Sequence, residues 1–330
     1  MTSRSITRSA VASAVALVTL TSVSAAACPR ADVDPPADPV AAPAVVRGDA
    51  ASRSEARTLP PDPALAEATA APVGTPAPTS TPAPAPSATP AAPSSAPGAV
   101  GIPDGTALAP MAGGTIDASG EIANVVIDSD VVFTGSDLTL RNVRVNGEAI
   151  IRGDRVQVAS SEFAALSISG SDAVTIAGTE VFGLTGRDGV HITSDTGPVT
   201  NVVIRDSLIH NPQVTATSHY DGIQVRGVDG LTLDGIRIDL GAFVPQHNAA
   251  LFLEDANGGN RNVTVTRSVL EGGGYTLYSF ASDVRITDTV LGSGEWGILF
   301  PSSRTGEVTE FRGNTDDAGR GLALRPGAIG

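Results

Sequence analysis

The chain has 330 residues and a formal net charge of −14, which argues against nucleic acid as a partner because a nucleic-acid-binding surface is basic. Of its 24 prolines only five lie beyond residue 110. The composition therefore separates a proline-rich first third from one later region of about 220 residues, long enough to bury a sizeable core.

The chain begins with a segment typical of an export signal. Arg4 and Arg8 precede a short apolar run over residues 10–23, which is followed by small residues. Because this run is too short to span a bilayer comfortably, we interpret residues 1–27 as a cleaved signal peptide. The sequence thus predicts an exported protein.

Cys28 is the only cysteine of the chain and directly follows three alanines. It resembles the lipidated cysteine of bacterial lipoproteins, although Ala25 stands where leucine is usual. The resemblance implies a lipid on Cys28 that anchors the protein to a membrane at the cell surface. The alternative is ordinary cleavage after Ala27, which would release a secreted protein. One cysteine forms no intrachain disulfide, so burial must supply the stability.

Residues 28–110 are rich in proline and alanine and hold few large apolar residues. Such a segment buries too little apolar surface to offset its chain entropy, so we expect it to be disordered. Alternating proline and alanine favour extended, polyproline-like conformations. We interpret this segment as a tether without chemistry of its own.

After residue 120 one short pattern recurs, in which apolar residues alternate with other residues and a polar or small pair follows. Its period of two and its β-branched residues predict strands. The copies read NVVIDSDVV from Asn124, DLTLRNVRV from Asp137, RVQVASSEF from Arg155, AVTIAGTEV from Ala173, NVVIRDSLI from Asn201, GLTLDGIRI from Gly230, NVTVTRSVL from Asn262 and DVRITDTVL from Asp283.

A second alternating segment lies between the copies, for example DGVHITS, DGIQVRG and AALFLED. Two or three short strands per repeat, recurring about every 18 to 32 residues, predict a coil that stacks on itself in about eight or nine turns. An all-β sandwich is the alternative, but the hairpin turn chemistry that it needs between neighbouring strands is missing.

Over about residues 115–320 these repeats resemble the right-handed parallel β-helix, or pectin-lyase-like, superfamily. The resemblance implies an all-β fold, a right-handed parallel β-helix solenoid over residues 111–330 behind the disordered tether. That superfamily includes polyuronate lyases, glycoside hydrolases, epimerases and proteins without known catalysis, so the fold alone does not select an activity. A polysaccharide is the partner that it implies.

Alignment of the second segments places residues in columns on the outer face of the predicted helix. We expect the inward column to be Val190, Ile223, Leu251, Leu277 and Ile298. The outward column that follows is His191, Gln224, Phe252, Tyr278 and Leu299. Two residues further along lie Thr193, Arg226, Glu254, Phe280 and Pro301. Just before the strands lie Asp188, Asp221, Ala249, Tyr275 and Trp296.

Four residues are the candidates for catalysis. All histidines fall in three consecutive coils, which are also the longest, and we expect His219 and His247 at equivalent positions of adjacent coils, where they could exchange protons. Stacking about 4.8 Å apart would make Asp188 and Asp221 a carboxylate pair. The alternative for both aspartates is turn chemistry at a strand start, with the side chain bonded to its own backbone.

The same columns suggest how a glycan would be held, because sugar rings lie on aromatic faces while their hydroxyls take hydrogen bonds. Arg226 or Arg187 could neutralise a substrate carboxylate. A capping element, or residues 315–330, could instead fold over the aromatic side chains. The predicted substrate-binding residues are His191, Tyr220, Gln224, Arg226, Phe252, Glu254, Tyr278 and Trp296.

The activity stays open between three classes. Many lyases of the superfamily use lysine or arginine as base beside a calcium site, but this chain has no lysine. An arginine, histidine or tyrosine version would remain, with Tyr220 as a possible acid. The Gly-His-Gly and Arg-x-Lys motifs of polygalacturonase-like hydrolases are absent. The third class is a non-catalytic glycan-binding or structural surface protein. No transition-metal motif is present, and calcium stays possible through the acidic columns.

Overall fold

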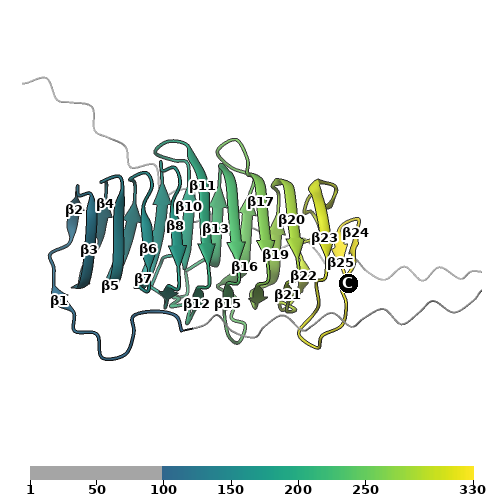
Figure 1. Cartoon of the computed structure of the whole chain (residues 1–330). Helices are drawn as coiled ribbons and strands as arrows, with labels where there is room; N and C mark the ends of the chain where they lie inside the picture. Colours follow the sequence, from purple (N-terminus) through teal and green to yellow (C-terminus); the bar gives the residue numbers. More distant parts are fainter. Residues whose placement is uncertain (1–98) are drawn as a thin grey trace, which may run out of the picture. The chain divides into compact units, whose positions relative to one another are not determined.

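The computed structural model describes residues 99–330. The predicted signal peptide, Cys28 and the tether up to residue 98 lie outside the described residues. From residue 109 onward the chain winds through successive coils of short parallel strands that stack along one axis (Figure 1). This is the all-β parallel helix that the repeats predict.

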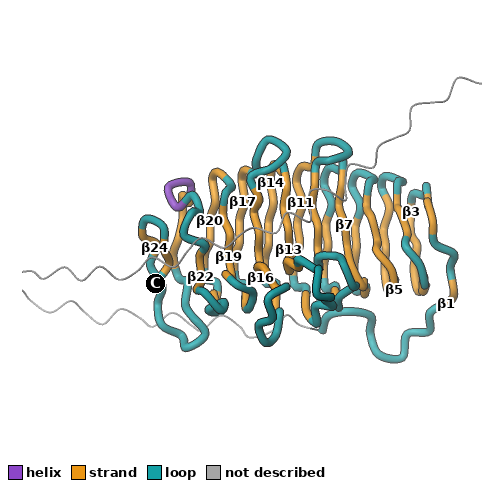
Figure 2. Tube along the Cα trace, turned by 180° about the vertical axis from the view of Figure 1, so that it is seen from behind, coloured by secondary structure: helices purple, strands orange, loops and turns teal. Residues whose placement is uncertain are grey.

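Three faces, here named sheets A, B and C, run along the stack (Figures 1 and 2). Sheet A contains β2 (Gly114–Ile116), β4 (Val131–Phe133), β5 (Leu138–Ile151), β7 (Glu162–Ser169), β10 (Val190–Thr193), β13 (Tyr220–Arg226), β16 (His247–Glu254), β19 (Tyr275–Ser279) and β22 (Gly297–Leu299). Sheet B contains β3 (Gly120–Ile127), β5, β6 (Gln157–Ala159), β8 (Thr175–Ala177), β11 (Val199–Arg205), β14 (Val228–Asp234), β17 (Arg261–Thr266), β20 (Ser282–Thr287) and β23 (Val308–Arg312). Sheet C contains β1 (Ala109–Pro110), β3, β5, β7, β9 (Glu180–Val181), β12 (Leu208–His210), β15 (Arg237–Asp239), β18 (Val269–Glu271) and β21 (Val290–Leu291).

Each coil bends between sheets B and C at one residue whose backbone is in the left-handed region of φ/ψ space. L residues adopt this conformation as single residues and not in runs. Asparagine, aspartate and glycine predominate there. Glycine has no Cβ to clash, and the short side chains of asparagine and aspartate can hydrogen-bond to the nearby backbone. Their φ angles lie between 48° and 69°, at Asn124, Asn142, Ser160, Gly178, Asp206, Gly235, Arg267, Asp288 and Gly313.

The core consists of inward apolar residues that stack from coil to coil. Leu140 pairs in register with Val158, and the column continues through Ile176, Ile204 and Leu233, each at most 1% exposed. Burying such a side chain contributes about 1.5–3 kcal/mol relative to leaving it exposed. The alternating strand pattern is therefore what holds the solenoid together.

A column of buried polar side chains stands beside the left-handed bend. Ser161 accepts a hydrogen bond from the Val143 amide at 3.1 Å, and Ser268 accepts one from the Ile236 amide at 3.2 Å. Ser207, Thr289 and Asn314 do the same for other coils. These residues satisfy amides where the ladder is interrupted, because an unpaired buried amide is costly.

The coils that carry the histidines are the longest, as the sequence predicts. The first coils repeat every 18 residues, as the spacing of stacked hydrogen-bond partners shows, whereas partners in the middle coils lie 28 to 35 residues apart. The extra residues form loops on both sides of the sheet A strands, residues 182–189, 211–219 and 240–246 on one side and 194–198 and 255–260 on the other (Figure 2).

Both ends of the described chain pack on the helix. The Gly101 amide donates to the Gly178 carbonyl at 2.9 Å, so residues before β1 lie against the fourth coil. At the other end a 3-10 turn, η1 (Thr305–Glu307), precedes β23, and an antiparallel pair follows, β24 (Leu324–Arg325) with β25 (Ala328–Ile329). Leu322 and Ile329 pack on the main core, so this hairpin does not form part of the aromatic cluster on sheet A. No helix within residues 99–330 is long and apolar enough to cross a membrane.

Candidate functional site

The outer face of sheet A presents the predicted columns in the predicted register from β10 to β19, over four coils. His191 pairs with Gln224, Gln224 with Phe252 and Phe252 with Tyr278. In the next column Thr193 pairs with Arg226 and Arg226 with Glu254. A patch of polar side chains is thus continued by aromatic side chains along one sheet.

The prediction for the last coil was wrong by one residue. Leu277 pairs with Leu299, not with Ile298, and Tyr275 pairs with Gly297, not with Trp296. A slip of one residue moves every side chain to the opposite face of a strand. Leu299 is therefore inward and 7% exposed, and Phe300 stacks on Tyr278 with ring centroids 4.6 Å apart.

Asp188 and Asp221 are neighbours at the start of adjacent strands, as predicted. The backbone amide of Asp221 donates to Oδ1 of Asp188 at 3.0 Å, so this bond joins two coils rather than closing a local turn. Asn248, from the following coil, donates to Oδ1 of Asp221 at 2.8 Å. Three consecutive coils therefore contribute to one polar cluster.

Burial determines the electrostatics of this pair. Asp221 is fully buried, and Asp188 is 8% exposed. Burial, together with the nearby charge of Asp188, raises the pKa of Asp221 well above its usual range, although the hydrogen bond from Asn248 acts the other way. Because the pKa of one of these two adjacent carboxyl groups is raised, the pair holds a proton at a pH where isolated aspartates are ionised.

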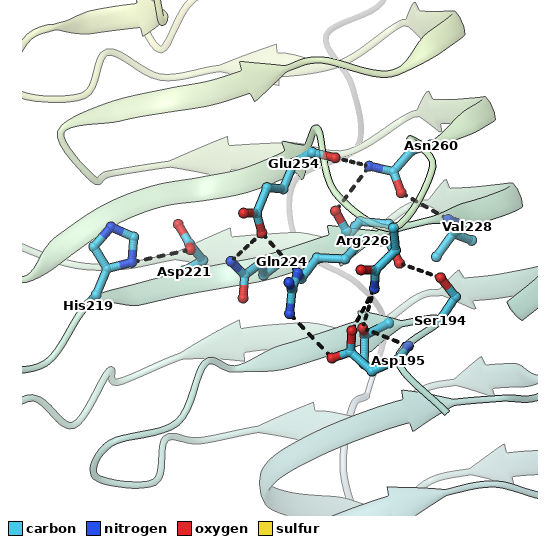
Figure 3. A network of polar contacts seen from close by, with 12 residues as sticks. Ser194, Asp195, His219, Asp221, Gln224, Arg226, Val228, Glu254 and Asn260 are labelled. Atoms are coloured by element: carbon cyan, nitrogen blue, oxygen red, sulfur yellow. Dashed lines mark hydrogen bonds and ion pairs between the residues drawn. The ribbon is translucent and has the colours of Figure 1, made fainter. Parts of the chain in front are cut away.

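The two candidate histidines are not at equivalent positions, which corrects the sequence alignment. Tyr220 pairs with His247 and Asp221 with Ala249, because a register shift lies between the two pairs. His219 is exposed, with Nδ1 3.8 Å from Oδ2 of Asp221 (Figure 3). His247 is 5% exposed. Its burial lowers its pKa, which favours the neutral ring.

Tyr220 lies in the main core and is 1% exposed, so in this structure it does not reach a ligand on the surface. Its hydroxyl has no hydrogen-bond partner among the described residues. Burial, and then the charges of Asp188 and Asp221, raise the pKa of this hydroxyl. The same buried position makes Tyr220 unsuitable as the surface acid that the sequence suggested.

A charged network lies at the other end of the strands (Figure 3). Arg226 is 3.3 Å from Oδ2 of Asp195 through Nη1 and 3.2 Å from Oε2 of Glu254 through Nε. Gln224 also donates to Glu254, at 3.1 Å. Both sides of the guanidinium are therefore already occupied by carboxylates of the protein.

Asparagine side chains hold the loops that carry this network. Asn257 donates to Oδ1 of Asp195 at 2.6 Å. Burial alone would raise the pKa of Asp195, but the hydrogen bonds from Asn257 and Thr193 and the charge of Arg226 outweigh it, so the pKa is lowered. Asn260, 3% exposed, donates to the carbonyls of Val225 and Glu254. Asp195 thus stays ionised beside Arg226.

A second arginine, Arg187, directly precedes Asp188 and pairs with a carboxylate of an earlier coil. Nε of Arg187 lies 2.6 Å from Oε2 of Glu148, and Oε1 of Glu148 accepts from Ser167 at 2.6 Å. His191, 8% exposed, lies between this pair and Gln224 in its column. His210 lies elsewhere, on sheet C, 2.7 Å from Glu180.

The aromatic side chains form a compact cluster rather than an open strip. Phe252 and Tyr278 are each only 6% exposed and pack with Tyr275, Phe280 and Phe300. Trp296 is 47% exposed and is the exposed large hydrophobic residue of the described chain. Its ring contacts those of Phe243 and Tyr275, with centroids 5.6 and 5.7 Å away. A ligand would therefore meet Trp296 before Phe252 or Tyr278.

Beyond the charged network lies an open hollow of about 400 Å³ between the loops that follow β10, β13 and β16. Its lining includes Pro198, Gly227 and Asn257. The two charged lining residues, Asp229 and Arg261, pair with each other at 2.8 Å. No group of three or more potential metal ligands is found within residues 99–330.

Sequence reasoning missed four residues of this face. Asn248 contacts Asp221, Asp195 pairs with Arg226 and is bound by Asn257, and Phe300 extends the aromatic cluster. Asn248 directly follows His247, and its position depends on the register shift in β16. Strand alternation carries no signal of such a shift. The loop residues Asp195 and Asn257 are 62 residues apart, so no local pattern joins them.

The chain belongs to the family described as "Right handed beta helix region", whose profile matches residues 125–316, more than half of the chain. Among solved structures it is similar to one titled "Crystal structure of pectate lyase Pel9A", at 15% identity and a TM-score of 0.34, covering 66% of this chain and 72% of that one. This likeness carries no inference about substrate. No curated protein matches the sequence.

Proposed function

We propose that the outer face of sheet A holds a polysaccharide and hydrolyses a glycosidic bond at the Asp188–Asp221 pair. The observation that carries this proposal is the stacked carboxyl pair, with one raised pKa, on the face where Trp296 stands exposed. One carboxyl group that keeps its proton beside one that can ionise is the combination that glycoside hydrolysis uses. The aromatic ring offers a surface for the apolar face of a sugar.

Each residue then has a defined part. Asp221 donates its proton to the glycosidic oxygen, which leaves with one sugar chain. Because stacked carboxyl groups stand too close to hold a water between them, Asp188 attacks the anomeric carbon as the nucleophile. Water then adds its oxygen to that carbon and releases Asp188, while Asp221 takes the proton that this water loses. Gln224 and His191 lie on the same face, where they can hydrogen-bond sugar hydroxyls. Trp296 positions the chain.

Hydrolysis is favoured over a lyase reaction by the state of the basic groups. A lyase needs a base for the proton beside a uronate carboxylate and a cation to neutralise that carboxylate. Arg226 and Arg187 are both held by carboxylates of the protein, and lysine is absent. His247, with its lowered pKa, is a neutral base but is 5% exposed.

A second candidate function follows from the burial of Asp221. A fully buried carboxyl group reaches a glycosidic oxygen only if the residues that cover it move aside, and His219, in the segment before β13, lies 3.8 Å from Oδ2 of Asp221. If those residues stay in place, the face binds a glycan without cleaving it. Non-catalytic glycan binding is thus the alternative that a specific contact supports.

The test is incubation of the full chain with a panel of neutral and uronate polysaccharides, reading both new reducing ends and the ultraviolet absorbance of unsaturated ends. Hydrolysis predicts reducing ends without absorbance, lost in Asp188→Asn and in Asp221→Asn. His210→Ala, on sheet C, is the matched control and should keep full activity. Absorbance that is lost in His219→Ala/His247→Ala would instead establish a lyase. Retained binding without any cleavage would leave the glycan-binding function.

We further propose that the protein is exported and that Cys28 carries a lipid anchor. The support is the signal-like segment before a solitary cysteine. Expression of the full chain in a bacterium with a labelled fatty acid should label the wild type and leave Cys28→Ser unlabelled. Equal labelling of the two proteins would overturn the anchor, and retention of both in the cytoplasm would overturn export.

A further inference from the structure

We infer that the sheet A face accepts a neutral glycan and discriminates against polyuronates. This inference deepens the proposed function and rests on it. The supporting observation is that Arg226 and Arg187 already form ion pairs with carboxylates of the protein, which sets the charge that a bound chain would meet.

Both arginines near the aspartate pair and the charged network are already paired with carboxylates of the protein. Arg226 lies between Asp195 and Glu254, and Arg187 is bound by Glu148. Asp188 adds a further acidic side chain beside Asp221, which retains a proton because of its raised pKa. Four acidic side chains therefore stand against two arginines, and the face presents an excess of negative formal charge to a ligand.

A polyuronate would have to displace a protein carboxylate from an arginine to gain one of its own. Each such exchange replaces one ion pair by another and leaves the displaced Asp195 or Glu254 beside the ligand's remaining carboxylates. Like charges placed together at an interface weaken binding and slow association. The net charge of −14 of the whole chain acts in the same direction.

The remaining surface suits uncharged sugar rings. Trp296 is exposed to stack on a ring face, and Gln224 and Asn257 are amides that can bind hydroxyls. The hollow beside the network has its only two charged lining residues, Asp229 and Arg261, paired with each other. The aromatic cluster and the hollow thus offer apolar and uncharged polar groups on either side of a network whose charges are already paired.

One arginine on this side of the molecule has no carboxylate partner within residues 99–330. Arg152 follows β5 at the sheet A edge, exposed, and makes no ion pair or side-chain hydrogen bond within the described part of the chain. It lies two coils before β10, away from the aspartate pair. Any weak attraction of an anionic polymer is therefore expected at Arg152, which makes Arg152→Ala the matched control.

The experiment measures binding of the full chain to galactomannan, xyloglucan and mixed-linkage β-glucan, and to polygalacturonate and alginate, by affinity electrophoresis at low and high salt. We expect at least one neutral glycan to bind at least about tenfold more tightly than either uronate. Asp195→Asn/Glu254→Gln, which frees Arg226, should raise uronate affinity at low salt, and this gain should vanish at high salt. Arg152→Ala should leave the neutral-glycan affinity as in the wild type.

The outcomes separate the two proposals. A uronate that binds more tightly than every neutral glycan would overturn the neutral-glycan inference and keep the polysaccharide function. The neutral-glycan inference is also overturned if the double variant gains no uronate affinity. The pairing of Arg226 with Asp195 and Glu254 would then not be the reason why uronates bind weakly. Absence of binding and of cleavage for all five polymers would overturn the proposed function itself.

Discussion

Replacing Asp221 by asparagine should remove a pH dependence from the stability of the β-helix. The folded protein raises the pKa of Asp221 above its ordinary value of 3.8, first through burial and then through the charge of Asp188. Below about pH 4 the group is protonated in both the folded and the unfolded chain, and its contribution to stability is fully present. As pH rises, the unfolded chain loses this proton first, so stability falls until the folded pKa is passed.

The magnitude follows from the size of the shift. Each unit by which the folded pKa exceeds the ordinary value removes about 1.4 kcal/mol from the free energy of unfolding at alkaline pH. Asparagine keeps an oxygen that can accept the hydrogen bond of Asn248, which contributes about 0.5–1.5 kcal/mol, and it carries no charge to bury. The variant should therefore match the wild type at about pH 4 and exceed it at about pH 8.

Urea denaturation followed by circular dichroism at a series of pH values measures this difference. Asp137→Asn is the control of opposite sign, because Arg155 lowers the pKa of the exposed Asp137. That substitution should lose a little stability at neutral pH and none in acid. A wild type and an Asp221→Asn variant whose midpoints change in parallel across the range would refute the raised pKa of Asp221.

Three further substitutions test the packing of the β-helix by the same urea denaturation. Ser268→Ala should lower the free energy of unfolding by about 1–3 kcal/mol, because the buried Ile236 amide loses its acceptor. Tyr220→Phe should raise it by about 1–3 kcal/mol, because the hydroxyl is buried without a partner among the described residues. Gly135→Ala should lower it by about 1–3 kcal/mol, since a Cβ would stand 1.7 Å from the Ala118 carbonyl oxygen.

Each of these has a clear contrary result. A Ser268→Ala protein as stable as the wild type would mean that another group takes over the amide. Destabilisation by Tyr220→Phe would show that the hydroxyl is bound in solution, for instance by an ordered water. An unchanged Gly135→Ala variant would mean that the second coil yields enough to admit a methyl group.

The solenoid was predictable from sequence because its determinants are local and repeated. Each strand shows its inward residues by alternation, and the same pattern recurs at every coil, so the errors of one repeat are corrected by the others. The alignment of the repeats also predicts the strand register correctly wherever two strands align without an extra residue, as for Val190, Ile223 and Leu251. That is why Asp188 and Asp221 were placed together correctly.

The predicted register was wrong where one strand carries an extra residue relative to its neighbour or a turn between coils changes length. The Tyr220–His247 pairing shifts the histidines out of equivalence, and the turn before Gly297 shifts the last coil. A period of two cannot reveal such a shift, because a strand displaced by one residue alternates equally well. Asn248 and Phe300 were missed for this reason.

The sequence by itself determined that the chain forms a parallel β-helix, which face bears the polar and aromatic columns, and which coils are enlarged. Only the tertiary structure decided which of those side chains are available. The loop after β10 brings Asp195, and strand β16 brings Glu254, onto Arg226, and the packing of the coils leaves Asp221 fully buried. Charge and access at a surface depend on neighbours that no local pattern specifies, because burial and ion pairing arise when distant segments pack.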